Sequence, residues 1–159
     1  MEDRVAYEIE RKFLVTGDGW RRAVVARRHL RQFYLAAGDG ASIRVRIADR
    51  THAWLTVKSA EAGARRSEFE YEIPVADADD MQSLAVGRII TKVRHIVPAD
   101  DLRWEIDVFE GDHAGLVIAE IELRTMDQTF GRPDWLGAEV THDRRYYNAA
   151  LALRPLDET

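Results

Sequence analysis

The chain contains no cysteine among its 159 residues. Disulfides, thiolate nucleophiles and cysteine-ligated zinc are therefore excluded. Histidine offers no substitute, because no zinc-ligand spacing links His29, His52, His95, His113 and His142. If the chain binds a metal ion, we expect oxygen ligands.

Long apolar runs and a surplus of basic residues are also missing. No stretch approaches the ~20 apolar residues of a membrane-spanning helix, and residues 1–7 are acidic and polar, unlike a signal peptide. With 28 acidic and 23 basic residues the net charge is −5, which disfavours non-specific binding to nucleic acid or to an anionic membrane. We therefore expect a cytoplasmic protein without nucleic-acid or membrane partners.

The length and composition are those of one domain. Hydrophobic residues make up 46% of the chain and charged residues 32%, which is ordinary for a soluble globular protein. No internal repeat or interdomain linker is evident. We assign residues 1–159 to a single domain and leave a homodimer open as an alternative to a monomer.

What the chain does have is a repeated alternation of charged and apolar residues. In residues 7–15, Glu8, Glu10 and Lys12 fall on alternate positions. A β-strand turns successive side chains to opposite faces, so this spacing places the charges along one line. The pattern recurs in six further segments, at 42–47, 55–58, 68–73, 92–94, 105–108 and 119–123.

The charges in these segments are sorted by sign. An exposed sheet face usually mixes signs, because like charges on neighbouring strands are destabilising. Here acidic pairs and basic pairs occupy separate segments, as expected if they converge on a ligand of matching charge. The alternative is an ordinary set of solvated sheet faces carrying surface ion pairs.

Turn-forming residues divide the chain into about eight extended segments. We expect strands at 6–15, 31–36, 41–48, 51–58, 66–75, 88–97, 101–109 and 115–124. The short separators favour antiparallel neighbours. Helical patterns are expected at 18–28, from Asp77 to about 85, and from Thr141 or Asp143 until Pro155.

These elements predict a fold that is mainly β with packed helices (α+β). Eight antiparallel strands can close into a barrel that holds side chains or one small ligand inside. If the helices cover the apolar faces from outside, the charged faces point inward. We therefore expect an eight-stranded antiparallel β-barrel that forms a charged tunnel.

The ordered series of motifs resembles the triphosphate tunnel metalloenzymes of the CYTH superfamily over nearly the whole chain. The signature Glu-x-Glu-x-Lys is present at 8–12, and the other motifs follow at 44–46, 58, 68–70, 92–94, 105–107 and 120–122. The resemblance implies an eight-stranded tunnel in which acids hold a divalent metal and bases hold a triphosphate.

The resemblance also implies a role for each residue. The metal ligands would be Glu8, Glu10, Glu120 and Glu122, with supporting acids at Glu68, Glu70, Glu105 and Asp107. The phosphates would be bound by Lys12, Arg44, Arg46, Lys58, Lys92, Arg94 and Arg145. The residues expected to act in catalysis are Glu10, Lys12, Tyr34 and Lys92. Hard oxygen ligands suit Mg²⁺ or Mn²⁺. Many relatives have a lysine where this chain has Arg144 and Arg145.

The resemblance implies a metal-dependent enzyme that hydrolyses inorganic triphosphate, a small-molecule substrate, to pyrophosphate and phosphate. A class IV adenylate cyclase, or a thiamine or nucleoside triphosphatase, would share the tunnel but need a site for the organic group. A noncatalytic module that binds triphosphate or polyphosphate is the alternative from another class, and it would not need all the metal-binding acids.

Overall fold

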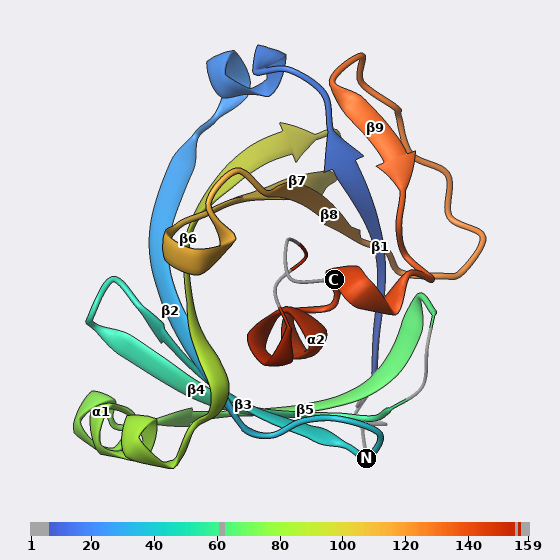
Figure 1. The fold of residues 1–159 in the computed structure, drawn as a ribbon. Helices are drawn as coiled ribbons and strands as arrows, with labels where there is room; N and C mark the ends of the chain where they lie inside the picture. The colour runs from blue at the N-terminus through green and yellow to red at the C-terminus, as the bar shows by residue number, and fades with distance from the viewer. Residues whose placement is uncertain (1–6, 61–62, 155, 157–159) are drawn as a thin grey trace, which may run out of the picture.

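The computed structural model describes residues 7–60, 63–154 and 156 of the chain. Its strands are β1 (Tyr7–Val15), β2 (Ala26–Ala36), β3 (Ser42–Ala48), β4 (His52–Lys58), β5 (Arg65–Ile73), β6 (Val86–Ala99), β7 (Leu102–Phe109), β8 (Val117–Glu122) and β9 (Leu136–Glu139). They pair in the order β5–β4–β3–β2–β6–β7–β8–β1–β9, and a further pairing of β5 with β1 closes the first eight into a ring (Figure 1). The predicted eight-stranded antiparallel barrel is confirmed.

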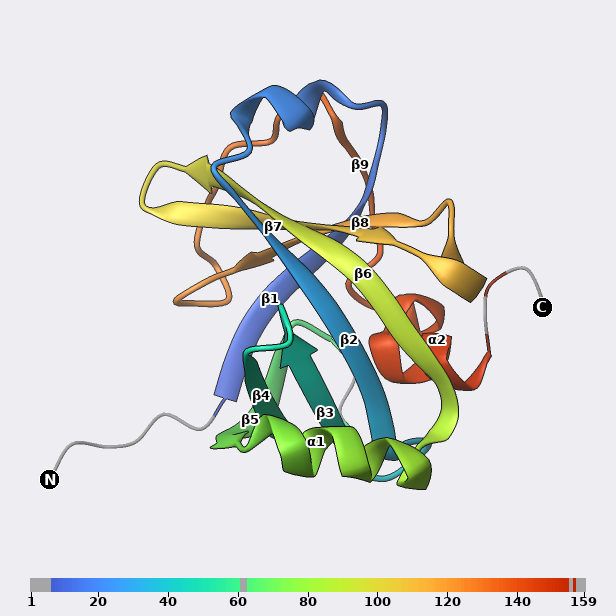
Figure 2. The same cartoon turned by 90° about the vertical axis from the view of Figure 1, so that its left-hand side faces the viewer.

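The helical elements are few and short. They are η1 (Gly19–Ala23), α1 (Val75–Met81), η2 (Gln82–Leu84), η3 (Gly111–His113), η4 (Arg144–Tyr146) and α2 (Asn148–Leu153). Helix α1 packs outside the barrel against β3 and β4, whereas α2 lies across one end of it (Figures 1 and 2). Within the described part of the chain, no helix has the length and apolar character to cross a membrane.

The strand register turns the alternating charges inward. Lys12 of β1 lies opposite Glu120 of β8, and Arg94 of β6 lies opposite Asp107 of β7. Because side chains alternate between the two faces of a strand, the apolar residues between these charges point outward. The barrel therefore has a charged interior and an apolar outer layer.

The outer layer needs cover, and two sets of elements provide it. Beneath the segment that carries β9, the buried side chains include Phe13, Trp104, Ile106 and Ile121. Beneath α1 they include Phe33, Val45, Ile47 and Ala53, with Ala78 contributed by the helix itself. The main apolar cores thus lie between the barrel wall and its covering segments.

The interior changes character at the end covered by α2. There the buried cluster contains Tyr34, Ile90, Phe109 and Ile118 from the strands, together with Leu151 of the helix. Glycine at position 87 permits the close approach of α2, because a Cβ at this residue (φ +73°) would lie 2.5 Å from the carbonyl oxygen of Ala152. Apolar packing therefore closes this end of the tunnel.

The expected helix at 18–28 is wrong. Only Gly19–Ala23 forms a 3₁₀ turn, and β2 already begins at Ala26. From Ala26 onward the backbone pairs with β6, starting opposite Ile96. Pairing with a distant strand has therefore outweighed the local helical preference of this segment. The short 3₁₀ turn that remains buries Trp20 against His95.

The two other helices and one strand also differ from expectation. Helix α1 begins directly after Pro74 rather than at Asp77. The C-terminal helix is broken at Tyr147, whose extended backbone separates η4 from α2; Pro155, its expected end, lies outside the described residues. Strand β9 was not expected, because only four residues pair with the outer part of β1.

Candidate active site

A cavity of about 280 Å³ lies inside the barrel. It is lined by Glu8, Glu10, Arg44, Arg46, Lys58, Glu68, Glu70, Arg94, Arg103, Glu105, Glu120, Glu122 and Asn148. Eleven of these lining residues were predicted as site residues from separate sequence motifs, and the fold brings them to one cavity. Three more, Lys12, Lys92 and Asp107, are buried beside it and form ion pairs with its lining or with each other.

The cations of β6 are paired with the acids of β7. Arg94 donates from Nε to Asp107 Oδ1 over 2.8 Å and from a terminal nitrogen to Oδ2 over 2.9 Å, and it also lies 2.9 Å from Glu105. Lys92 Nζ is 2.6 Å from Asp107. Burial would raise the pKa of Asp107, but Arg94 and Lys92 outweigh it and hold that pKa well below its usual value.

The cations of β3 have no such acids. Within the described ranges, neither Arg44 nor Arg46 forms an ion pair: Arg44 donates to Thr56 Oγ1 over 3.4 Å and Arg46 to Gln32 Oε1 over 2.8 Å. The buried Nε of Arg44 has no hydrogen-bond partner. Burial and the charges of Arg44 and Arg94 lower the pKa of Arg46 to about 9. Within the described chain, neither guanidinium group is therefore neutralised by a directly paired carboxylate.

The acids of β1 and β8 repel one another. Glu10 lies opposite Glu122 in the strand register. Burial, followed by the charges of Glu120 and Glu8, raises the pKa of Glu10 to about 7. Burial and neighbouring carboxylates also raise the pKa of Glu122. Glu120 differs: although burial raises its pKa, the charges of Lys12 and Arg94 outweigh this and lower the pKa to about 2.

Two of these acids are partly neutralised by lysine. Lys58 contacts Glu8, and Lys12 Nζ lies 3.5 Å from Glu120. Burial lowers the pKa of Lys58, but the charges of Glu10 and Glu8 outweigh it and the pKa is raised overall. The lysines therefore occupy carboxylate oxygens that a metal ion could otherwise use.

The acid cluster fits a divalent metal in its chemistry. Its donors are hard carboxylate oxygens, and the pKa values of Glu8, Glu10 and Glu122 are raised, first by burial and then by neighbouring carboxylates, so a bound cation would favour their charged form. In the described part of the chain, however, no three acidic or histidine side chains are grouped closely enough to hold an ion. Binding a metal would require carboxylates to leave their lysine partners.

Two predicted residues lie away from the cavity. Tyr34 is 4% exposed and belongs to the apolar cluster at the α2 end. Arg145 has a side chain that is 64% exposed and pairs with Asp143 at 2.7 Å. The structure brings neither of them to the cavity lining.

Three residues of the site were missed by the sequence reasoning. Arg103 and Asn148 line the cavity, and Gln32 is fully buried against Arg46. The two strand residues carry a usable signal, because Arg103 lies two positions before Glu105 and Gln32 two before Tyr34, so each shares an inward face. Asn148 has no such signal, since it comes from α2.

A second cavity, of about 310 Å³, adjoins the first at the end away from α2. It shares Arg44, Arg46 and Arg94 with the tunnel and adds Arg28 and Trp54. Since apolar packing closes the other end, we take this side as the entrance to the tunnel.

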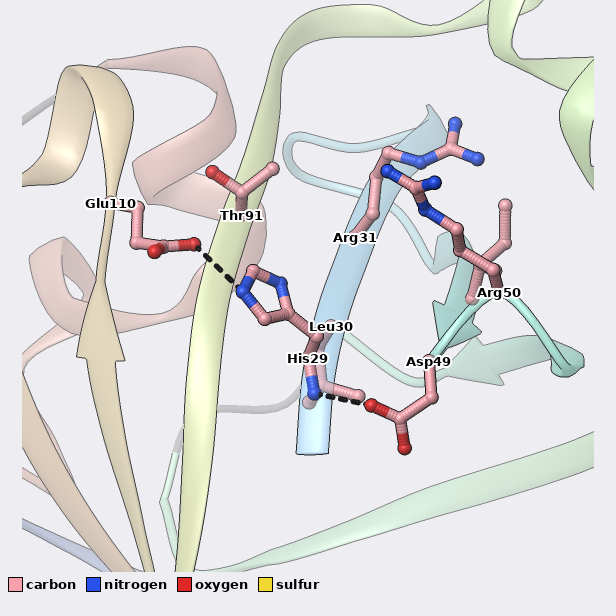
Figure 3. A pocket seen from close by; sticks show the side chains of 8 residues that line it. His29, Leu30, Arg31, Asp49, Arg50, Thr91 and Glu110 are labelled. Carbon is pink, nitrogen blue, oxygen red and sulfur yellow. Dashed lines mark hydrogen bonds and ion pairs between the residues drawn. The ribbon is translucent and has the colours of Figure 1, made fainter. Parts of the chain in front are cut away.

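A larger cavity, of about 520 Å³, lies outside the barrel (Figure 3). Three of its polar residues contact one another: His29 lies 3.8 Å from Glu110 and donates its backbone N–H to Asp49 over 2.8 Å. Arg31 is held by Asp79 of α1 at 2.5 Å. This cavity shares no lining residue with the 280 Å³ cavity inside the barrel.

A closed antiparallel barrel with clustered acids beside free guanidinium groups defines a class of protein built to bind a polyanion inside a tunnel. The chain belongs to the CYTH domain family, whose pattern matches residues 6–148. It is 41% identical over 149 residues to an inorganic triphosphatase of Acetivibrio thermocellus, covering 93% of this chain and 94% of the other.

Two further relatives agree. An inorganic triphosphatase of Nitrosomonas europaea is 40% identical over 152 residues, covering 92% of this chain and 97% of its own. A crystal structure of an inorganic triphosphatase, 37% identical, superposes with a TM-score of 0.65 and covers 92% of this chain and 94% of the other. The similarity therefore includes sequence, length and fold.

Proposed function

We propose that this protein is a metal-dependent hydrolase that cleaves inorganic triphosphate to pyrophosphate and phosphate inside the barrel. The observation that carries the proposal is the pair of guanidinium groups, Arg44 and Arg46, that face the acid-lined cavity without a carboxylate partner in the described chain. The names of the similar proteins support the same reaction.

The phosphates lie against the guanidinium groups of Arg44 and Arg46. Arginine can hold a phosphate through two parallel N–H···O bonds, and here no ion pair has to be broken first. When the carboxylates bind a divalent metal ion, Lys58 and Lys12 no longer pair with them and contact phosphate oxygens instead. Arg94, held by Asp107 and Glu105, supplies a fixed positive charge.

A divalent cation, Mg²⁺ or Mn²⁺, would be held by Glu8, Glu10, Glu120 and Glu122, and when bound it supplies positive charge that offsets the charge developing on the phosphates. The chain's own cations contribute to the same end from the opposite wall. A water molecule attacks the terminal phosphorus in line with the leaving pyrophosphate, so no covalent enzyme intermediate is formed. We assign Glu10, whose pKa is about 7, to accept a proton from that water.

The test is an assay of phosphate release from inorganic triphosphate and from ATP, with added Mg²⁺, with added Mn²⁺, or with a chelator. We expect hydrolysis that requires either metal, and a higher kcat/KM for inorganic triphosphate, since the tunnel lining is polar throughout. Analysis of the products from ATP also detects a cyclic nucleotide. Full turnover in chelator, or a preference for ATP, would contradict the proposal.

A matched pair of variants separates the metal from the phosphate roles. Glu10→Gln keeps the size of the side chain but removes a carboxylate charge, so kcat should fall severely and more metal should be needed for half-maximal activity. The control is Glu139→Gln, the same change on the barrel exterior, where Glu139 pairs with Arg11 at 2.5 Å. Equal activity of the two variants would remove Glu10 from the site.

A further inference from the structure

Helix α2 contributes one side chain to the cavity lining, that of its first residue, Asn148. The side-chain oxygen of Asn148 accepts two hydrogen bonds, one from Lys92 Nζ over 3.1 Å and one from Gln32 Nε2 over 3.0 Å. Gln32 in turn accepts a hydrogen bond from Arg46 Nε over 2.8 Å. A chain of hydrogen bonds therefore links Arg46 and Lys92 through two side-chain amides.

The orientation of both amides is fixed by chemistry. The Nε of arginine can only donate, so Gln32 must turn its oxygen to Arg46 and its NH₂ group to Asn148. Asn148 must then present its oxygen to Gln32, and the ammonium of Lys92 requires the same. Flipping either amide would bring two donors together in a buried site. The NH₂ group of Asn148 is thereby directed away from Lys92 and Gln32, the two residues that hold its oxygen.

That NH₂ group has no acceptor within the described residues, although Asn148 lines the cavity. It is a neutral donor on a residue that contacts the buried Lys92 and is linked through Gln32 to Arg46. Such a position suits an oxygen that carries negative charge, because the cations attract the anion and the amide adds a directed hydrogen bond. Neither strand alternation nor charge identifies this residue as part of the site.

We propose that Asn148 is a substrate-binding residue, which donates hydrogen bonds from its NH₂ group to a phosphate at the closed end of the tunnel, with Gln32 as the positioning residue that fixes its orientation. This inference rests on the proposed function. Helix α2 then has a role beyond closing the barrel, because it supplies a contact to the deepest phosphate.

The competing explanation is structural: Asn148 would serve only as the acceptor for Lys92 and Gln32. Three variants separate the two. Asn148→Asp keeps the accepting oxygen and removes the donor, Asn148→Leu removes both without adding charge, and Gln32→Met removes the link while leaving the donor of Asn148 in place. Leu153→Ala, at an exposed position of the same helix, is the control.

Affinity is measured by calorimetry with an inorganic triphosphate whose bridging oxygens are replaced by NH groups, so that binding is observed without turnover. We expect Asn148→Asp and Asn148→Leu each to weaken binding by about tenfold or more, Gln32→Met to weaken it less, and Leu153→Ala to leave it unchanged. Thermal unfolding of each variant is recorded alongside.

The outcomes are distinguishable. Wild-type affinity in Asn148→Asp would show that the accepting oxygen is all that matters, and wild-type affinity in Asn148→Leu would show that only added charge weakens binding; either result overturns the proposal. So does a loss in Gln32→Met equal to that in Asn148→Leu. If wild-type protein binds the analogue but releases no phosphate from inorganic triphosphate, the proposed hydrolase activity fails while the role of Asn148 is still tested.

Discussion

Two walls of the tunnel carry the same kind of residue in different states. On the β6–β7 wall, Lys92 and Arg94 are tied to Asp107, which is 1% exposed. On the β3 wall, Arg44 and Arg46 form no ion pair with any part of the chain that the structure describes. The same alternating sequence pattern predicted the cations of both walls, but only those of the β6–β7 wall are neutralised by acidic residues of the protein.

The difference separates charges that hold the fold from charges that await a ligand. A buried ion pair whose partner is removed leaves an uncompensated charge, which is strongly destabilising. A buried cation that never had a partner costs stability already, so its removal relieves repulsion. Substitutions that break the ion pairs of the β6–β7 wall should therefore lower stability. Substitutions of the arginines on the β3 wall should lower affinity for the ligand and leave stability unchanged or increased.

The largest expected effect is on the paired wall. Asp107→Asn leaves Lys92 and Arg94 without their shared carboxylate, and we expect a loss of about 3–5 kcal/mol in the free energy of unfolding. Urea titration monitored by circular dichroism measures it. A loss below about 1 kcal/mol, the range typical of surface pairs, would mean that the two walls do not differ.

A smaller effect is expected from the acid cluster, and it should depend on pH. The pKa of Glu10 is raised from 4.5 to about 7, so the folded chain holds a proton that the unfolded chain has released, and the free energy of unfolding falls as pH rises through this window. In chelator, Glu10→Gln should stabilise the protein by roughly 1–3 kcal/mol at about pH 8 and by much less at about pH 5. Thermal unfolding at both pH values tests this, and an equal shift at the two would count against the raised pKa.

On the β3 wall the expected change is in affinity. Arg46→Ala removes a phosphate contact, so KM for inorganic triphosphate should rise about tenfold or more, equivalent to about 1.4 kcal/mol. Stability should stay constant or increase, because Arg46 is repelled by Arg44 and Arg94. Arg94→Ala is the comparison, since it should destabilise the protein by breaking the pair with Asp107. A similar loss of stability in Arg46→Ala and Arg94→Ala would contradict the proposed difference between the two walls.

The smallest effect is expected outside the barrel. Arg11 and Glu139 form a partly exposed pair, and their hydrogen bond lowers the pKa of Glu139 to about 2. A depressed pKa contributes stability that is present above the unfolded value of 4.5 and is lost as pH falls toward 2. Glu139→Gln should therefore cost less than about 1 kcal/mol at neutral pH and nothing at the acid end of the window. Urea titrations at the two pH values provide the measurement.

The sequence predicted the barrel because strand alternation is local. Glu8, Glu10 and Lys12 reveal their common face by spacing alone, and each later motif does the same. Helix boundaries depended on distant partners: residues 26–28 follow a helical spacing but pair with β6 instead. Strand β9 was not predicted because its four residues are too few to show an alternation of polar and apolar side chains.

For the candidate site, the charged residue types and their alternate spacing along the strands identified most of the residues that line the cavity. They did not show which of these residues form ion pairs with one another. Nothing in the spacing of Arg44 and Arg94 indicates that one would be free and the other bound to two acids, because this depends on which strands become neighbours. Asn148 was beyond reach for a related reason, since a helix from the chain's other end places it in the tunnel.

The apolar packing of α2 against Tyr34, Ile90 and Phe109 makes the tunnel blind at one end. A linear substrate must enter and its products must leave through the same opening. Whichever fragment lies nearer α2 is therefore trapped until the outer fragment has departed. The two products are then released in order of their distance from the opening. The product that occupies the outer position should compete with substrate when it is added to the solution.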